Sequence, residues 1–158
     1  GNDIRQLLLR TRGEVPVPKA EALLYQADRA QHVETVIKPA LAAKKWVLSD
    51  RFAASSIAFQ TGGRALKPED VEWLNEFSTG HLQPDLYVLL DLSVEESLRR
   101  LQGRPQETDR FEREQKDFHQ RVRESYLTLA RAEPKRWLCL PADQGPAVLL
   151  STLLRELR

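Results

Sequence analysis

The residues best suited to chemistry follow a short apolar segment in the first third of the chain. Asp50 and Arg51 come directly after the segment WVLS at 46–49, which has the character of a buried strand. At the carboxyl end of such a strand, the guanidinium of Arg51 can hold a phosphate, and the Asp50 carboxylate can organise Mg²⁺ or orient an attacking oxygen. The dipeptide alone is more often a surface ion pair, so its meaning depends on its neighbours.

The segment after this pair carries polar side chains at helical spacing. Ser55, Ser56 and Gln60 lie on a short stretch with helical character, and Ser56 and Gln60 are four residues apart, which places them on one face. Hydroxyl and carboxamide groups on one face can read the edge of a nucleotide base. Capping hydroxyls and a solvated glutamine would give the same pattern.

A second pair with the same spacing lies upstream, on a longer helical pattern. Tyr25 and Arg29 share a helix face, where a ring can stack on a base and a guanidinium can hydrogen-bond its edge. Taken alone, such a pair usually reflects surface packing.

Four arginines surround a polar segment, GRPQET at 103–108. They are Arg99, Arg100, Arg104 and Arg110. A basic loop between two helices can close over a polyphosphate and neutralise charge in a transition state. Pairing of these arginines with the neighbouring glutamates explains the same composition equally well.

Other chemistries find little support. His32, His81 and His119 have no metal-ligand spacing with cysteine or acidic residues. The chain contains no GxSxG, no GxGxxG and no GxxxxGK[ST] motif.

Composition indicates a globular protein that does not depend on bulk charge. The 158 residues fit one domain, and the formal net charge of +1 argues against a nucleic-acid partner bound by general electrostatics. The one cysteine, Cys139, excludes an internal disulfide and lies in an apolar run where a buried thiol is expected. We find no apolar stretch long enough for a membrane span and no secretory signal, so we expect no membrane partner and a cytoplasmic location.

Strand-like and helix-like patterns alternate along the chain. Continuous apolar runs predict strands at 46–49, 86–92 and 136–140, covered on both faces as in a parallel sheet. Helices are predicted over 4–12, 19–43, 67–79, 93–101, 110–132 and 146–157. We expect Pro39 to perturb the second helix and Ser93 to cap the fourth. This order predicts an α/β fold with helices on both faces of a parallel sheet and functional residues at the carboxyl ends of strands.

Taken in their order along the chain, segments of this sequence resemble bacterial thymidylate kinases. The resemblance rests on IRQLLL at 4–9, KAEALLYQADRAQHVETVIKPAL at 19–41, WVLSDRFAASSIAFQTGGR at 46–64, PDLYVLLDLSVEESLRR at 84–100, and DRFE followed by VRESYLTLA. Single segments are common motifs, but their order and spacing make the match specific.

The resemblance implies a fold and an activity. The fold is the three-layer fold of phosphate-binding-loop nucleoside-monophosphate kinases, here as a single domain over 1–158. The activity is phosphoryl transfer from ATP to dTMP with Mg²⁺, giving ADP and dTDP for dTTP synthesis. It also implies a homodimer, for which the apolar face of the 19–43 helix is a candidate surface.

The resemblance assigns roles residue by residue. In the acceptor site, Tyr25 stacks on thymine and Arg29 contacts the base edge, while Ser56 and Gln60 read the base. Phe59 shapes the sugar site, and Tyr126 approaches the nucleotide. Arg51 holds the acceptor phosphate, and Asp50 is tied to Mg²⁺ and transfer geometry. Arg100 and Arg104 match catalytic arginines of a lid loop at 100–110, although the lid spacing is one residue longer than is typical.

The chain departs from the family in one respect. The family begins with a strand, the phosphate-binding loop, a helix and a second strand, and none of these is found in the sequence. We therefore expect the domain to be incomplete at its N-terminus, to lack the first two strands, and to be inactive as this segment alone.

Two other functions remain open at this stage. One is a non-catalytic nucleotide-binding or dimerisation module that retains the acceptor pocket. The other is a related nucleoside-monophosphate kinase, against which the combination of Tyr25, Arg29, Ser56 and Gln60 favours thymine.

Overall fold

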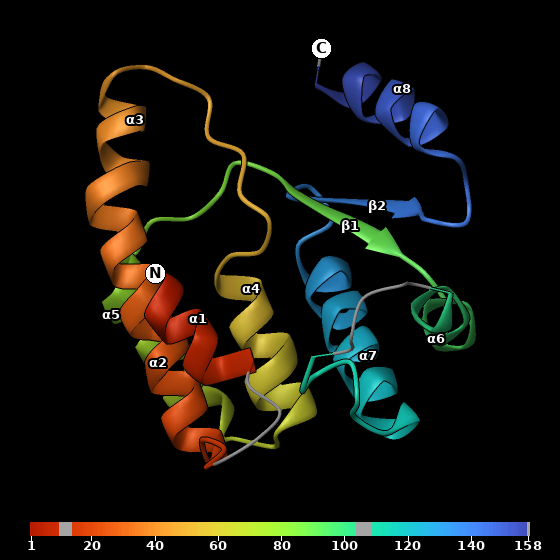
Figure 1. Cartoon of the computed structure of the whole chain (residues 1–158). Helices are drawn as coiled ribbons and strands as arrows, with labels where there is room; N and C mark the ends of the chain where they lie inside the picture. The colour runs from red at the N-terminus through yellow and green to blue at the C-terminus, as the bar shows by residue number, and fades with distance from the viewer. Residues whose placement is uncertain (10–13, 104–108, 158) are drawn as a thin grey trace.

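The computed structural model describes residues 1–9, 14–103 and 109–157. Within these ranges the chain forms helices and two strands (Figure 1). In order they are α1 (Asn2–Leu9), α2 (Pro18–His32), η1 (Val33–Ile37), α3 (Lys38–Ala42), α4 (Ala53–Ser56), η2 (Ile57–Gly63), α5 (Pro68–Thr79), β1 (Tyr87–Asp91), α6 (Val94–Gln102), α7 (Lys116–Ala132), β2 (Trp137–Pro141) and α8 (Pro146–Glu156).

The two strands pair in parallel, as the alternation of elements predicted. The register runs from Tyr87 opposite Trp137 to Asp91 opposite Pro141. The chain crosses between them through α6 and α7, and α7 and α8 lie on opposite sides of the strand pair (Figure 1). The α/β fold with a parallel sheet is therefore confirmed.

The strand predicted at 46–49 is wrong in this structure. Residues 46–49 are extended but outside any strand, and the side chains of Trp46 and Leu48 are 89% and 98% exposed. A strand needs a hydrogen-bonding neighbour, and the only ladder among the described residues joins β1 to β2. Hydrophobic composition alone cannot supply that neighbour.

Burial of the strands on both faces is also wrong. Val88 and Leu90 of β1 are exposed, while the alternate residues of the strand are half-buried. The Cys139 thiol, expected to be buried, lies on an exposed residue of β2. The described residues thus cover one face of β1 better than the other.

The long helix predicted over 19–43 is present as the continuous run α2, η1 and α3. Its middle part, η1, is π-helical, and the Lys38 amide donates to the Val33 carbonyl. This widened turn lies just before Pro39, which has no amide hydrogen and crowds the preceding turn. The predicted perturbation is confirmed. On the apolar face of this run, Val33 and Ile37 are buried, while Leu23 and Val36 are exposed.

Of the helix predicted over 4–12, residues 4–9 lie in α1, and residues 10–12 lie outside the described residues. The other helices follow their predicted ranges within one residue, with one exception. Helix α6 begins after Ser93, whose hydroxyl accepts a hydrogen bond from the Glu96 amide. The helix predicted from residue 110 begins only at Lys116. Before it, the Asp109 carboxylate accepts hydrogen bonds from the amides of Phe111 and Glu112, which favours a turn over a helix.

Aromatic rings fill the space between α2, η2 and α7. Phe111, Phe118, Val122 and Ala58 form a buried cluster, and partly buried side chains pack against it: Leu9, Tyr25, Phe59 and Tyr126. This cluster holds the helices that carry the predicted site residues against one another.

Candidate active site

One face of α2 carries three functional groups at consecutive four-residue steps. They are Glu21, Tyr25 and Arg29, which share a stripe along the helix. The partners of this stripe lie on α4 and η2: Arg29 bonds Ser56, and Glu21 bonds Gln60. Ser56 and Gln60 therefore face the same helix, as their spacing predicted.

The guanidinium of Arg29 is held by a buried polar network. Its Nη1 donates to Ser56 Oγ at 2.7 Å, Gln26 Oε1 at 2.9 Å and Asn75 Oδ1 at 3.0 Å, and its Nη2 donates to the Phe52 carbonyl at 3.1 Å. Asn75 in turn donates to the Ala53 carbonyl at 3.1 Å. A side chain with this many partners has one orientation, which suits recognition of a planar group.

Burial shifts the pKa of both predicted base-contacting residues on α2. Burial lowers the pKa of Arg29 to about 10, an effect that nearby tyrosines partly oppose. Burial raises the pKa of Tyr25 to about 12, with the Glu21 carboxylate adding to the shift. At neutral pH the stripe therefore presents a guanidinium cation and a neutral phenol.

Arg51 lies over the edge of the aromatic cluster. Its guanidinium carbon is 4.9 Å from the centre of the Phe59 ring, and its Nη1 is 3.4 Å from Tyr126 Oη. Tyr126 Oη also shares a hydrogen bond of 2.7 Å with Ser55 Oγ. The structure thus brings together Arg51, Phe59 and Tyr126 from segments far apart in the sequence.

The backbone of Arg51 is left-handed, with φ of 71°. This conformation costs a residue other than glycine about 1 kcal/mol or more. The Arg51 carbonyl accepts a hydrogen bond from Ser49 Oγ at 2.8 Å, which supports the turn. Such strain is common where a chain must direct one side chain into a site.

Asp50 is exposed beside this turn. Among the residues that the structure describes, no group of three or more histidine, cysteine or acidic side chains could hold a metal ion. A single carboxylate still fits Mg²⁺ that keeps waters and is shared with substrate phosphates.

Gln60 is buried against the other end of the α2 stripe. Its Nε2 donates to Glu21 Oε1 at 3.2 Å, and both side chains are almost fully enclosed. Arg64 and Arg110 also pair with Glu21.

Arg100, one of the two predicted lid arginines, makes its contacts away from this cluster. Arg100 pairs with Glu96 at 2.7 Å and donates to the Ala142 carbonyl at 3.0 Å. Arg104 lies outside the described residues, as does part of the predicted lid at 100–110.

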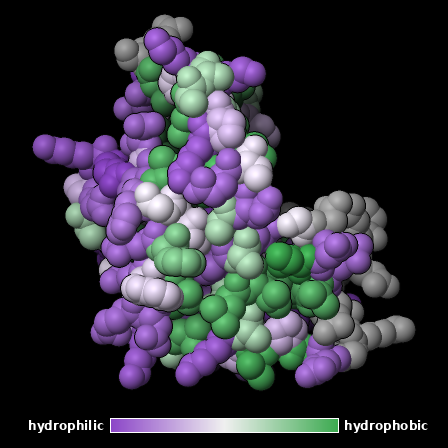
Figure 2. Space-filling view, turned by 90° about the vertical axis from the view of Figure 1, so that its left-hand side faces the viewer, coloured by the Kyte–Doolittle hydropathy of each residue, from purple (hydrophilic) through white to green (hydrophobic). Residues whose placement is uncertain are grey.

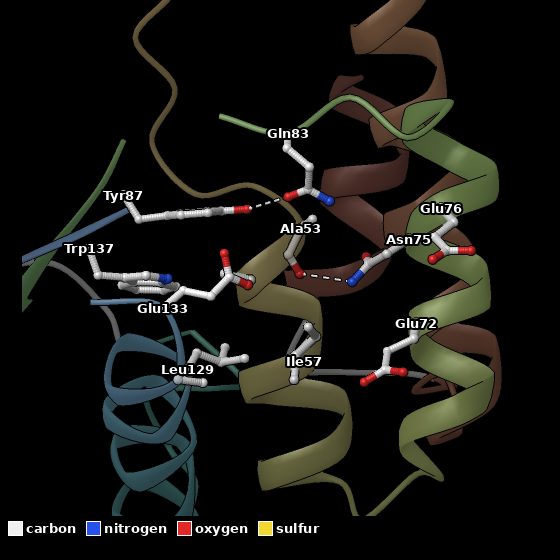
Figure 3. A pocket seen from close by; sticks show the side chains of 12 residues that line it. Ala53, Ile57, Glu72, Asn75, Glu76, Gln83, Tyr87, Leu129, Glu133 and Trp137 are labelled. Carbon is white, nitrogen blue, oxygen red and sulfur yellow. Dashed lines mark hydrogen bonds between the residues drawn. The ribbon is translucent and has the colours of Figure 1, made fainter. Parts of the chain in front are cut away.

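A cavity of about 200 Å³ lies between α4, α5, α7 and the first residues of both strands (Figure 3). The stacked rings of Tyr87 and Trp137 form one wall, and Asn75 and Glu72 lie opposite. No predicted site residue lines it. Asn75 connects it to the site, since the same side chain accepts a hydrogen bond from Arg29.

Sequence reasoning missed several residues that build the site. Glu21 could have been found, because it continues the four-residue spacing of Tyr25 and Arg29. Asn75 and Phe111 reach the site from α5 and from the turn before α7, and no spacing in the sequence relates them to it.

A parallel α/β fold in which an arginine at a sharp turn lies near a buried stripe of aromatic and polar side chains is typical of proteins that bind nucleotide phosphates. Comparison with known proteins gives the family. The family model described as thymidylate kinase matches residues 1–151, so the chain belongs to the thymidylate kinase family.

Individual relatives agree with this result. A thymidylate kinase from Bdellovibrio bacteriovorus is 53% identical, with the match covering 99% of this chain and 75% of that protein. One from Parasynechococcus marenigrum is 46% identical, over 99% of this chain and 74% of that protein. The crystal structure of thymidylate kinase from Ehrlichia chaffeensis is 25% identical, with a TM-score of 0.73, and the match covers 99% of this chain and 73% of that one.

The helices described here are not of a kind that crosses a membrane. Within residues 1–9, 14–103 and 109–157, none is both long and apolar enough to do so.

Proposed function

We propose that this protein transfers the γ-phosphoryl group of ATP to dTMP, giving dTDP and ADP. One observation carries the proposal beyond family membership. The stripe of Tyr25 and Arg29 on α2 faces Ser56 and Gln60, and Arg51 lies beside the same aromatic cluster. Base-reading groups and a phosphate-binding group thus belong to one site.

Each side chain has a role that its surroundings support. Tyr25 stacks on thymine, and Arg29 with Ser56 hydrogen-bonds the base edge, because the buried network keeps both in place. Gln60 contacts the base from the other end of the stripe. Phe59 and Tyr126 bound the sugar, and the Arg51 guanidinium binds the acceptor phosphate.

The remaining groups concern the transferred phosphoryl group. Asp50 would hold Mg²⁺ or its waters at the strained turn, and the ion supplies charge neutralisation when it is bound. Arg100 and Arg104 belong to the proposed lid at 100–110. Arg100 must exchange its contacts with Glu96 and Ala142 in order to reach a nucleotide.

We also propose that two copies of the chain associate through the side formed by α1 and α2. Figure 2 shows hydrophobic residues gathered over the lower part of this face. Exposed apolar side chains in this part of the chain include Leu7, Val17 and Leu23, and Leu23 is 57% exposed. Exposed apolar patches of this kind mark association surfaces.

The acceptor can be tested with the intact protein expressed from its complete gene. Release of ADP from ATP would be measured with dTMP, dUMP, dCMP and dGMP at matched concentrations. We expect kcat/KM to be highest for dTMP. A higher kcat/KM for dCMP or dGMP would refute the assignment of thymine as the base. If none of the four nucleotides were phosphorylated, the proposed kinase activity would be refuted.

A further inference from the structure

Glu21 is the most enclosed acidic residue described. Its side chain is 1% exposed, yet it lies one helical turn from Tyr25 and directly against Gln60. A carboxylate in such a position is stable only when its oxygens are paired. Glu21 meets this condition through three donors.

The donors hold the carboxylate by both of its oxygens. Oε1 accepts from Arg64 Nε at 3.3 Å and from Gln60 Nε2 at 3.2 Å, while Oε2 accepts from Arg110. Arg110 is anchored in turn, because its Nε donates to the Leu8 carbonyl at 3.2 Å. Glu21 therefore cannot turn away from Gln60 without losing an arginine.

This arrangement determines which way round the Gln60 amide lies. An ionised carboxylate only accepts hydrogen bonds, so the amide must direct its NH₂ group toward Glu21. The carbonyl oxygen Oε1 of Gln60 is then directed away from Glu21. Turning the amide over would set two acceptor oxygens against each other in a buried place, which is costly.

We propose that Glu21 is a positioning residue for base specificity, acting through the orientation of the Gln60 amide. The inference rests on the proposed function. A carbonyl oxygen accepts a hydrogen bond from the N3–H group of thymine or uracil, but N3 of cytosine is itself an acceptor. Glu21 therefore favours pyrimidines that carry a proton at N3 and disfavours cytosine.

The test is Glu21→Gln in the intact protein, with kcat/KM measured for dTMP and for dCMP. The new amide carries both a donor and an acceptor, so the Gln60 amide is no longer held in one orientation. We expect the ratio of kcat/KM for dTMP to that for dCMP to fall about tenfold or more, which is the effect of one mispaired hydrogen bond. Loss of general stability would lower both values together and leave the ratio unchanged.

Glu114→Gln is the matched control. Glu114 also pairs with Arg64, but no hydrogen bond joins it to Gln60. Neutralising it disturbs the same ion-pair network and leaves the Gln60 amide held by Glu21. The dTMP-to-dCMP ratio of this variant should stay within about twofold of that of the parent, since no base-reading hydrogen bond changes.

A second variant, Glu21→Asp, covers the case in which Glu21→Gln does not fold. It keeps the negative charge for the two arginines but withdraws the carboxylate from Gln60, and the ratio should again fall. A folded Glu21 variant with the parent's ratio would overturn the inference. A parent protein that does not phosphorylate dTMP would instead overturn the proposed function.

Discussion

At the scale of single residues, Arg51 links backbone strain to function. Its left-handed φ of 71° is unfavourable for arginine, while its exposed side chain lies over Phe59 and beside Tyr126. Its contacts contribute little to stability, because an exposed guanidinium gains little from them. The conformation is therefore explained better by where it places the guanidinium than by the stability of the fold.

Replacement of Arg51 by glycine separates these two effects. Glycine adopts the left-handed conformation freely, so we expect Arg51→Gly to leave the free energy of unfolding unchanged or to raise it by up to about 1 kcal/mol. Loss of the phosphate contact should lower kcat/KM for dTMP by about 100-fold or more. Denaturant unfolding and steady-state kinetics measure the two quantities.

Lys44→Gly is the matched control, because Lys44 also has a positive φ, of 57°, and lies in an exposed turn away from the site. It should show a similar change in stability with no change in kcat/KM. If Arg51→Gly kept the parent's kcat/KM, Arg51 would not be the phosphate ligand.

At the scale of elements, the site depends on how closely η2 packs on α7. A side chain at Gly63 would place its Cβ 2.5 Å from Phe118 Cε2 and 3.1 Å from Val122 Cγ2. We expect Gly63→Ala to lower the free energy of unfolding by about 1–3 kcal/mol, because the ring must move within a packed cluster. Chemical denaturation measures the change.

Gly103→Ala, at the end of α6, is the control for this change. Its Cβ would lie 3.6 Å from the Arg100 carbonyl oxygen and 4.0 Å from the Arg99 carbonyl oxygen, which are ordinary contacts, and its φ is −81°. Stability should stay the same or rise slightly. An equal decrease in the free energy of unfolding of the two variants would mean that close packing at Gly63 does not hold the site together.

The local elements could be predicted from the sequence, but their tertiary partners could not. Ser93 indicated where α6 begins, and four-residue spacing placed Ser56 and Gln60 on the face that meets α2. By contrast, the hydrophobic segment at 46–49 suggested a strand although no neighbour pairs with it. The contribution of Asn75 was unpredictable because it depends on how α5 packs on α2.

At the scale of the whole molecule, we expect the protein to form a dimer through the surface that α1 and α2 provide. We expect Leu23→Glu to halve the mass in sedimentation experiments, because a charge would then be buried between two copies. Arg131→Glu, an exposed change on α7, should leave the mass unchanged. A monomeric parent would contradict the proposed association.

The most direct test of the central claim is the product formed by the intact protein from dTMP and ATP in the presence of Mg²⁺. Chromatographic separation of the nucleotides identifies and quantifies it. The proposed acceptor site predicts dTDP and ADP in equal amounts, with dTDP formation dependent on Arg51. Absence of dTDP, or ADP released without a phosphorylated thymidine nucleotide, would contradict it.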